Sequence, residues 1–477
     1  MKVKDTDLAF LLSSQVLDGH TSIEEILKWI DNRRNSTQVN IKLIKFSELK
    51  KWEFDKINSN LYHESKKFFS IEGLEVNTNW RKKETWTQPI INQPEIGFLG
   101  IITKKINGIL HFLMQAKIEP GNINYVQISP TLQATKSNYS KVHKGKTPLY
   151  LEYFNGEKKV NILLDQLQSE QGARFLKKRN RNIIIEVYDD INVYDDFCWI
   201  TLGQIKKLLK YDNLVNMDTR TVISGISFGT IDDTGIELIN TFIYTNSKYN
   251  TDDYNINMLR SSLTEEHHSK SIEHIISWLT ELKTKYELEL GRIPLKDVKD
   301  WNITDNEIAH KDKKYFSVIA ADISISNREV VNWSQPLIKS AQEGLIAFIV
   351  KKINGVYHIL IQAKVEIGNF DIIELAPTVQ CLTGNYRIGQ NEYDVPFIEE
   401  VLNAKEENII YKTYQSEEGG RFYREQNLNM IVEADDNFNE CIPENYCWMT
   451  LNQLFTFIKF NNYLNIQARS LISAIRI

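Results

Sequence analysis

Polar side chains gather where an apolar stretch ends, in the segment Gln115-Ala-Lys117-Ile-Glu119-Pro-Gly-Asn122. Residues that alternate along a strand share one face, so Lys117 and Glu119 can reach the same pocket. A carboxylate and an ammonium group are side chains that acid–base chemistry uses. The alternative is an ion pair on the surface, although such a pair would not require the neighbouring Gln and Asn.

A second polar segment, Ser129-Pro-Thr-Leu-Gln-Ala-Thr-Lys-Ser-Asn-Tyr139, carries hydroxyl and amide groups at close spacing. These groups both donate and accept hydrogen bonds, as the recognition of a sugar or of the edge of a base requires. Loops of this composition are common, so the segment by itself is a weak signal.

A basic segment precedes a stretch of apolar residues. It places five cations within eight positions, namely Arg174, Lys177, Lys178, Arg179 and Arg181. Because guanidinium groups present forked donors that match phosphate oxygens, the segment can be a diphosphate clamp. It can equally be a solvated basic face.

Most of these motifs occur twice. Trp86-Thr-Gln-Pro89 returns as Trp333-Ser-Gln-Pro336, and the same offset of 247 positions relates the other polar motifs; from Cys198 onward it becomes 249. A period of this length exceeds any solenoid unit, so the chain is a tandem duplication of a whole domain. The basic segment is weaker in the second copy, where Arg421 is kept and the following charges are diluted.

The pattern predicts three parts, at residues 1–227, 228–270 and 271–477. Each copy should begin with a helix, because Ser22 and Ser271 stand as N-caps before amphipathic stretches. Residues 228–270 form the connecting segment, and the polar stretch from Asn246 to Lys270 is the best linker candidate.

Within the first copy, Phe98–Thr103 and Ile109–Gln115 read as two strands around an Asn107-Gly108 turn. Asn182–Tyr188 reads as another strand and Leu202–Leu209 as a short helix. Mixed sheets with flanking helices indicate an α+β fold.

Composition and missing motifs exclude several classes of protein. The chain has 477 residues and a net charge of −5, which argues against a dedicated nucleic-acid binder. We find no stretch typical of a membrane span or a signal peptide, no Rossmann fingerprint and no P-loop. The four cysteines suit neither a disulfide framework nor a zinc site, which indicates a reducing, cytoplasmic compartment.

Taken in order, the motifs resemble those of the NDP-hexose 2,3-dehydratases. They include Trp86-x-Gln-Pro89, Gln115-Ala-Lys117, Ser137-Asn-Tyr139, Gln168-Ser-Glu-Gln-Gly172 and Val215-Asn-x-Asp218. The resemblance covers nearly the whole chain. It implies a homodimer whose halves are two Nudix-like domains, each with a pocket for a nucleoside diphosphate sugar, chiefly dTDP-4-keto-6-deoxyglucose, and no metal or other cofactor.

The sequence agrees with one implication directly. A working Nudix hydrolase holds magnesium through an Arg-Glu-x-x-Glu-Glu helix, whereas Ser169-Glu-Gln-Gly172 keeps at most a fragment of that motif. Metal-dependent cleavage of a diphosphate is therefore disfavoured.

The implied reaction removes the proton on carbon 3 and the hydroxyl on carbon 2 of the 4-keto sugar. We expect the first pocket to be catalytic, with Glu119, Tyr139 or His143 as base or acid and Lys117 opposite the developing oxyanion. Glu170 is a further carboxylate to consider. The second pocket is expected to be an auxiliary or regulatory site for a nucleotide sugar.

Substrate contacts are expected from the repeated motifs. In the first copy they are Trp86, Gln115, Thr131, Gln133, Ser137, Asn138, Glu170, Arg174, Arg179 and Arg181, and in the second Gln362, Lys364, Thr378, Gln380, Tyr386 and Arg421. The three arginines of the first copy would hold the diphosphate, and Trp86 or a tyrosine would stack on the base, although Trp86 can equally be core. Two rival functions stay open: a non-catalytic nucleotide-sugar-binding or regulatory protein, and an RNA-binding protein that uses the basic segment.

Overall fold

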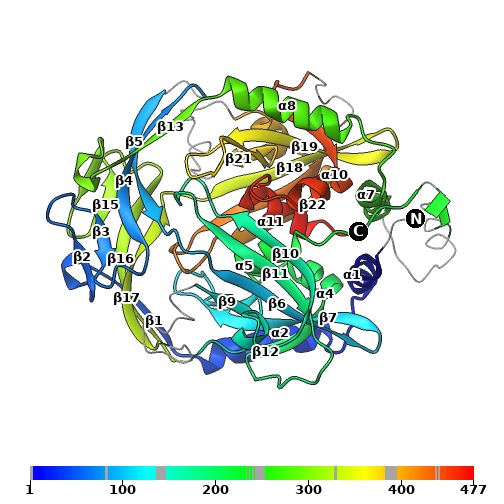
Figure 1. Cartoon of the computed structure of the whole chain (residues 1–477), viewed down its shortest axis with the longest axis horizontal. Coiled ribbons are helices and arrows are strands. Elements are labelled where there is room, and N and C mark those ends of the chain that lie inside the picture. Colours follow the sequence, from blue (N-terminus) through cyan, green and yellow to red (C-terminus); the bar gives the residue numbers. More distant parts are fainter. Residues whose placement is uncertain are drawn as a thin grey trace.

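The computed structural model describes residues 4–80, 84–135, 147–232, 234–235, 237–238, 241, 253–326, 330–381, 395–435, 438 and 441–477. Within this part of the chain the strands form four sheets, two of seven strands and two of five. Figure 1 shows the two larger sheets one above the other, with the smaller sheets together at one side. No helix of the described part is long and apolar enough to cross a membrane.

The larger sheet of the first half contains the predicted hairpin. Its order is β10 (Asn161–Ser169), β11 (Arg179–Glu186), β6 (Phe98–Ile106), β7 (Ile109–Ile118) and β12 (Phe197–Thr201), with β8 (Val126–Ser129) on β7 and β9 (Leu132–Ala134) on β6. β11 runs parallel to β6, and the other pairs are antiparallel. Asn107 and Gly108 have φ of 51° and 80°, the left-handed turn that an Asn-Gly pair favours.

The second half repeats this sheet. Its order is β20 (Ile373–Ala376), β19 (Val356–Val365), β18 (Gly344–Ile353), β23 (Gln426–Glu433) and β22 (Ile409–Ser416), with β21 (Val379–Cys381) on β18 and β24 (Tyr446–Thr450) on β19. β23 is again the parallel neighbour, on β18. The duplication in the sequence is therefore a duplication of structure.

The smaller sheets join the two halves, because each takes one strand from the other half. β1 (Val39–Ile44) pairs with β16 (Phe316–Ile325), and β13 (Leu288–Ile293) pairs with β4 (Ser70–Thr78). The remaining strands are β2 (Trp52–Phe54), β3 (Leu61–His63), β5 (Thr85–Asn92), β14 (Trp301–Ile303), β15 (Glu307–His310) and β17 (Asn332–Ser340). The halves are thus intertwined rather than separate.

The helices predicted after Ser22 and Ser271 are present, but another helix precedes each of them in its half, so neither is the first. Ser22 and Ser271 cap α2 (Ile23–Ser36) and α8 (Ile272–Lys285) through their side-chain oxygens. The predicted short helix is α4 (Leu202–Leu208), whose counterpart is α10 (Leu451–Ile458). The short elements are α9 (Ile398–Leu402), η1 (Phe46–Glu48), η2 (Leu151–Tyr153), η3 (Leu295–Asp297) and η5 (Glu406–Asn408).

The linker prediction is wrong for part of the stretch from Asn246 to Lys270. Residues 253–263 form α7 (Asp253–Leu263), which repeats α1 (Asp5–Gln15) of the first half. Ser13 and Ser261 make the same contact, each hydroxyl donating at 2.6 Å to a backbone carbonyl of its own half. The polar composition concealed an amphipathic helix, because Met258, Leu259 and Leu263 recur at helical spacing and are buried.

Two helices meet at the centre, α5 (Met217–Ile223) and α11 (Ile466–Ala474). Each carries a fully buried arginine that binds the opposite half. Arg220 donates to the Oε1 atom of Gln415 at 2.7 Å and to the carbonyl of Ser416, while Arg469 donates to the carbonyl of Ser169. A buried guanidinium needs hydrogen-bond partners, so these contacts fix the positions of the two halves relative to each other.

Candidate functional site

Two cavities lie among the four sheets, each lined by residues from both halves. The Glu119 cavity has a volume of about 400 Å³ and the Glu366 cavity one of about 540 Å³. Small-molecule sites commonly occupy about 300–1,000 Å³. Each cavity is therefore large enough for a ligand of metabolite size.

The Glu119 cavity gathers several predicted residues. Lys117 stands near the end of β7, Glu119 follows that strand, and Gln133 comes from β9, which pairs with β6. The Gln133 amide donates to the Oε1 atom of Glu119 at 2.6 Å, and Glu119 is buried. Glu170 lines the same cavity, so the predicted convergence of these four residues is present.

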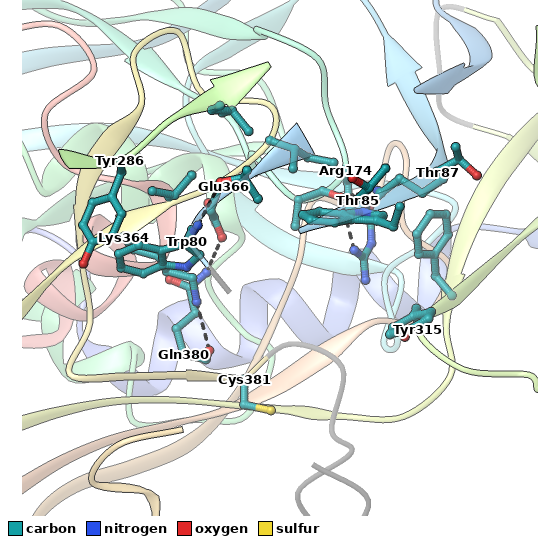
Figure 2. A pocket seen from close by; sticks show the side chains of 18 of the residues that line it. Trp80, Thr85, Thr87, Arg174, Tyr286, Tyr315, Lys364, Glu366, Gln380 and Cys381 are labelled. Atoms are coloured by element: carbon teal, nitrogen blue, oxygen red, sulfur yellow. Dashed lines mark hydrogen bonds between the residues drawn. The ribbon is translucent and has the colours of Figure 1, made fainter. Parts of the chain in front are cut away.

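The Glu366 cavity repeats this arrangement, as Figure 2 shows. The Gln380 amide donates to the Oε1 atom of Glu366 at 2.7 Å, and Lys364 donates to the Gln380 carbonyl at 3.1 Å. Gln362 lines this cavity as well, whereas its counterpart Gln115 does not line the Glu119 cavity. Trp80 meets Tyr286 edge to face at a centroid distance of 4.6 Å, which gives the wall an aromatic corner.

Two loops, at residues 170–175 and 417–422, cross between the halves. The Gly121 amide donates to the Gly419 carbonyl at 2.7 Å, and the Gly368 amide donates to the Gly172 carbonyl at the same distance. A Cβ atom on Gly121 would lie 1.6 Å from the carbonyl oxygen of Phe422. Only glycine allows so close an approach of two backbones, which explains the Gly that follows Glu-Pro in the first motif.

This crossing corrects the expected placement of the two arginines. Arg174 lines the Glu366 cavity and stacks on Phe316 at 4.3 Å, whereas Arg421 lines the Glu119 cavity and stacks on Phe69 at 4.3 Å. Each arginine therefore serves the pocket of the opposite half. Arg174 is buried, and its Nε and Nη2 atoms have no hydrogen-bond partner in the described chain.

The tryptophan motifs are exchanged in the same way. Trp86 lines the Glu366 cavity, and Trp333 lines the Glu119 cavity. Each indole N–H donates to the glutamine two residues later, Trp86 to Gln88 at 3.0 Å and Trp333 to Gln335 at 2.9 Å. The aromatic side chains thus belong to cavity walls, but Trp86 is not in the first pocket.

The other two arginines of the expected diphosphate clamp lie outside both cavities. Arg181 donates to both carboxylate oxygens of Asp165 at 2.7 and 2.5 Å, and Arg179 stacks on Phe370 at 4.5 Å. Alternation along β11 puts Arg179 and Arg181 on the face opposite to Asn180, which lines the Glu119 cavity together with Lys178, the residue before the strand.

Thr131 and Thr378 also differ from the expectation, because their hydroxyls serve the backbone. Thr131 accepts the amide of Ile102 at 2.9 Å and donates to the carbonyl of Leu113; Thr378 accepts the amide of Ile349 at 2.9 Å and donates to the carbonyl of Leu360. Both are buried and neither lines a cavity.

Five predicted residues lie outside the described part of the chain: Ser137, Asn138, Tyr139, His143 and Tyr386. Thr135 and Pro148, which lie on either side of the first four in the sequence, line the Glu119 cavity. Cys381 and Val395, on either side of the stretch that contains Tyr386, line the Glu366 cavity.

Several charged residues that line the Glu119 cavity had no individual role in the sequence-based prediction. They are Lys178, Asp218 and Glu418, the last supplied by the second half, together with Lys50 and Lys51. Differences between the copies could have revealed Lys178, Asp218 and Glu418, because their counterparts by the repeat offset are Glu425, Gln467 and Gln171. None of these three counterparts is among the residues that line the Glu366 cavity, so the two cavities differ at these positions.

Burial governs the electrostatics of the Glu119 cavity. Burial raises the pKa of Glu170 despite the nearby Lys178, and burial lowers the pKa of Lys178 despite Glu170. Burial also raises the pKa of Glu418 to about 8, although Arg421 acts in the opposite direction. Carboxyl groups of this kind can hold a proton near neutral pH and release it during a reaction.

The described residues include no group of three or more His, Cys, Asp or Glu side chains arranged to hold a metal ion. One carboxyl group of the Glu119 cavity, that of Glu170, lies beside an amide and a cation. Glu170 accepts the Asn180 amide at 2.7 Å, and Lys178 donates to the Oδ1 atom of that same Asn180 at 3.0 Å. This arrangement suits proton transfer and anion stabilisation.

Comparison with known proteins identifies the class of enzyme. A family model described as NDP-hexose 2,3-dehydratase matches residues 23–226 and 272–475. The chain belongs to this family of hydro-lyases, as the motifs predicted.

Three relatives carry one name, dTDP-4-dehydro-6-deoxy-alpha-D-glucopyranose 2,3-dehydratase. The protein from Saccharopolyspora spinosa is 45% identical over 96% of this chain and 92% of its own length. Those from Amycolatopsis orientalis and Streptomyces violaceoruber are 39% and 38% identical, over 97% and 94% of this chain and 92% and 96% of their own lengths.

Proposed function

We propose that this protein removes water across carbons 2 and 3 of dTDP-4-keto-6-deoxyglucose. The observation that carries the proposal is the full-length similarity to three proteins named for that one reaction. The product is the 3,4-diketo-2,6-dideoxy sugar, an intermediate suited to deoxysugar biosynthesis. A purely binding or regulatory protein is the alternative.

The chemistry of the substrate defines what the protein must supply. The 4-keto group acidifies the hydrogen on carbon 3, because the anion left behind is an enolate. In the Glu119 cavity we assign Glu119 as the base that takes this proton and Lys117 as the cation that stabilises the enolate oxygen. The support is that both side chains line one cavity, beside Gln133, which orients Glu119.

The nucleoside diphosphate needs cations and flat apolar surfaces. We propose that Arg421 binds the diphosphate in the Glu119 cavity, because it lines that cavity with its guanidinium plane held against Phe69. Trp333 offers a surface on which a base can stack. By the same reasoning, Arg174 and Trp86 equip the Glu366 cavity as an auxiliary nucleotide-sugar site.

The experiment is incubation with dTDP-4-keto-6-deoxyglucose and mass spectrometry of the products. We expect loss of one water, and trapping of the vicinal diketone by an aromatic ortho-diamine. Calorimetric titration with dTDP provides the matched binding measurement. Binding of dTDP without loss of water would favour the non-catalytic alternative.

We further propose that each half is a Nudix-type scaffold and that the chain forms a homodimer. The scaffold proposal is supported by the mixed sheet that occurs once in each half, with one parallel pair among antiparallel strands. The dimer proposal rests on the family resemblance. Sedimentation equilibrium should give twice the mass of the chain, and the monomer mass would contradict it.

A further inference from the structure

Among the carboxyl groups of the Glu119 cavity, Asp218 has the least support from hydrogen-bond donors and cations. Glu119 accepts an amide from Gln133, Glu170 accepts one from Asn180, and Glu418 lies beside Arg421. Asp218 lines the cavity and is only 2% exposed, yet it receives no hydrogen bond from the side chain of another described residue. A buried carboxyl without donors is better accommodated with its proton than without it.

The groups that face Asp218 act mostly in the same direction. Burial raises the pKa of Asp218 well above its usual range, and Glu119, Glu418 and Glu170 raise it further, while Lys117 acts against them. Its place in the first turn of α5 also favours the anion, but burial among three carboxyl groups outweighs that effect. Burial and the neighbouring carboxyl groups therefore favour the protonated form of Asp218.

The second half provides an internal comparison. The residue equivalent to Asp218 is Gln467, which is fully buried and cannot exchange a proton. Glu119, Lys117 and Gln133 each have an identical counterpart in the Glu366 cavity, namely Glu366, Lys364 and Gln380. The duplication has thus preserved the groups expected to bind and orient, and it differs at this one titratable position of the central helix.

We propose that Asp218 is the general acid that protonates the oxygen leaving carbon 2. This inference rests on the proposed function. Glu119 takes the proton from carbon 3, and the electron pair of that bond forms the enolate beside Lys117. The enolate then expels the carbon 2 oxygen as that carbon–oxygen bond breaks, and Asp218 gives its proton to the departing group, so that water leaves.

The remaining steps balance without another reactant. The enol product becomes the diketone when its carbon 3 hydroxyl proton is replaced by one on carbon 2, with no net gain or loss of protons. Glu119 then holds one extra proton and Asp218 lacks one, and transfer between them through solvent restores both. No oxidant or reductant is needed, because carbon 3 is oxidised as carbon 2 is reduced.

The test separates removal of the carbon 3 proton from loss of water. The full-length chain and its D218N and E119Q variants are incubated with dTDP-4-keto-6-deoxyglucose in D₂O, and both water loss and deuterium at carbon 3 of recovered substrate are measured. We expect D218N to lose about 100-fold or more in dehydration while it still exchanges the carbon 3 hydrogen. E119Q should lose both activities.

Controls keep the result interpretable. D165N makes the same substitution on the exposed ion pair with Arg181 and should dehydrate at the unmodified rate. Thermal unfolding and dTDP binding report whether D218N is folded. D218Q is a second variant, because the equivalent position of the second half accepts a buried glutamine.

The outcomes are distinct. Exchange without dehydration in D218N or D218Q supports the assignment. Dehydration at the unmodified rate overturns it, and so does loss of exchange together with dehydration in a variant that still binds dTDP, since Asp218 would then be needed for the first step. No dehydration by the unmodified chain overturns the proposed function and this inference with it.

Discussion

At the scale of residues, the sequence predicted which side chains meet within one half. Lys117, Glu119 and Gln133 were expected together because strand alternation and repeated motifs place them so, and they line one cavity. Lys178 was expected only as one of the five cations of the basic segment, and Asp218 only as part of a motif. The burial of a charge is not visible in one copy of the repeat, since the same residue type in a solvated run looks identical, and only the differences between the copies mark these two positions.

Replacement of Glu119 by glutamine tests the base. E119Q keeps the shape of the side chain but cannot accept a proton, so we expect kcat to fall by about 100- to 10,000-fold. Binding of dTDP should change little, because glutamine keeps the size of the side chain and the proposed diphosphate contact is made by a different residue, Arg421. Steady-state kinetics and calorimetry measure the two quantities, and unchanged kcat would remove Glu119 from the mechanism.

The sequence placed Arg174 in the first pocket and Arg421 in the second. The structure exchanges them, so the predicted effects of replacing these two arginines are exchanged as well. R421A should raise KM for the sugar nucleotide at the catalytic cavity by about 10- to 100-fold, the range for loss of a charge-assisted contact. R174A is its matched partner, because it removes the equivalent arginine from the Glu366 cavity. It should abolish one of the two dTDP sites in a titration, the auxiliary one, while KM changes less. A larger effect of R174A on KM would place catalysis in the Glu366 cavity.

At the scale of elements, glycines allow the loops to cross between the halves. In G121A a Cβ atom would lie 1.6 Å from a backbone carbonyl oxygen, which the loop cannot avoid by a rotamer change. We expect a loss of about 3 kcal/mol or more in the free energy of unfolding, at the upper end for overpacking. Chemical denaturation measures it.

The matched control for that substitution is G291A. Gly291 lies in β13, and the nearest atom to its added Cβ is a side-chain oxygen at 3.7 Å. The change should therefore alter stability by less than about 1 kcal/mol. Equal stability of the two variants would show that the loops separate easily.

A buried carboxyl between the halves predicts how stability depends on pH. Burial raises the pKa of Glu374 to about 8, and the Ser169 hydroxyl donates to its Oε2 atom at 2.7 Å. The unfolded chain releases this proton near pH 4.3, whereas the folded chain keeps it to about pH 8. The contribution of Glu374 to the free energy of unfolding is therefore full below about pH 4 and is lost as the pH rises to 8.

E374Q should flatten that decline by an amount on the order of a few kcal/mol between pH 5 and 8. Glutamine is tolerated at the equivalent place, because Gln127 accepts the Ser416 hydroxyl at 2.9 Å in the first half. Denaturation curves across this pH range measure the difference, and an unchanged slope would contradict the assignment of a buried neutral carboxyl.

At the scale of the whole molecule, the sequence repeat shows which residues of the two halves are equivalent. It does not show that the halves exchange residues between their pockets. The same Trp-x-Gln-Pro motif stands in both halves, so the sequence is identical whether each copy completes its own pocket or the other's. Only long-range strand pairing decides this, through β1 on β16 and β13 on β4. The exchanged strands are the ones expected if a strand-swapped homodimer had been joined into one chain.

That origin predicts that neither half folds alone as a monomer. Residues 1–227, expressed separately, would leave β4 without β13 and β1 without β16. Arg220 would lose its partners Gln415 and Ser416, and the Ser169 carbonyl would lose Arg469. Unpaired strand edges and unmet buried polar groups both disfavour such a state. We expect either aggregation or a swapped dimer of the half, and dehydration only when both halves are co-expressed. Sedimentation velocity and thermal unfolding distinguish these states: a half that sediments at its own mass and unfolds cooperatively would show that the exchange is dispensable.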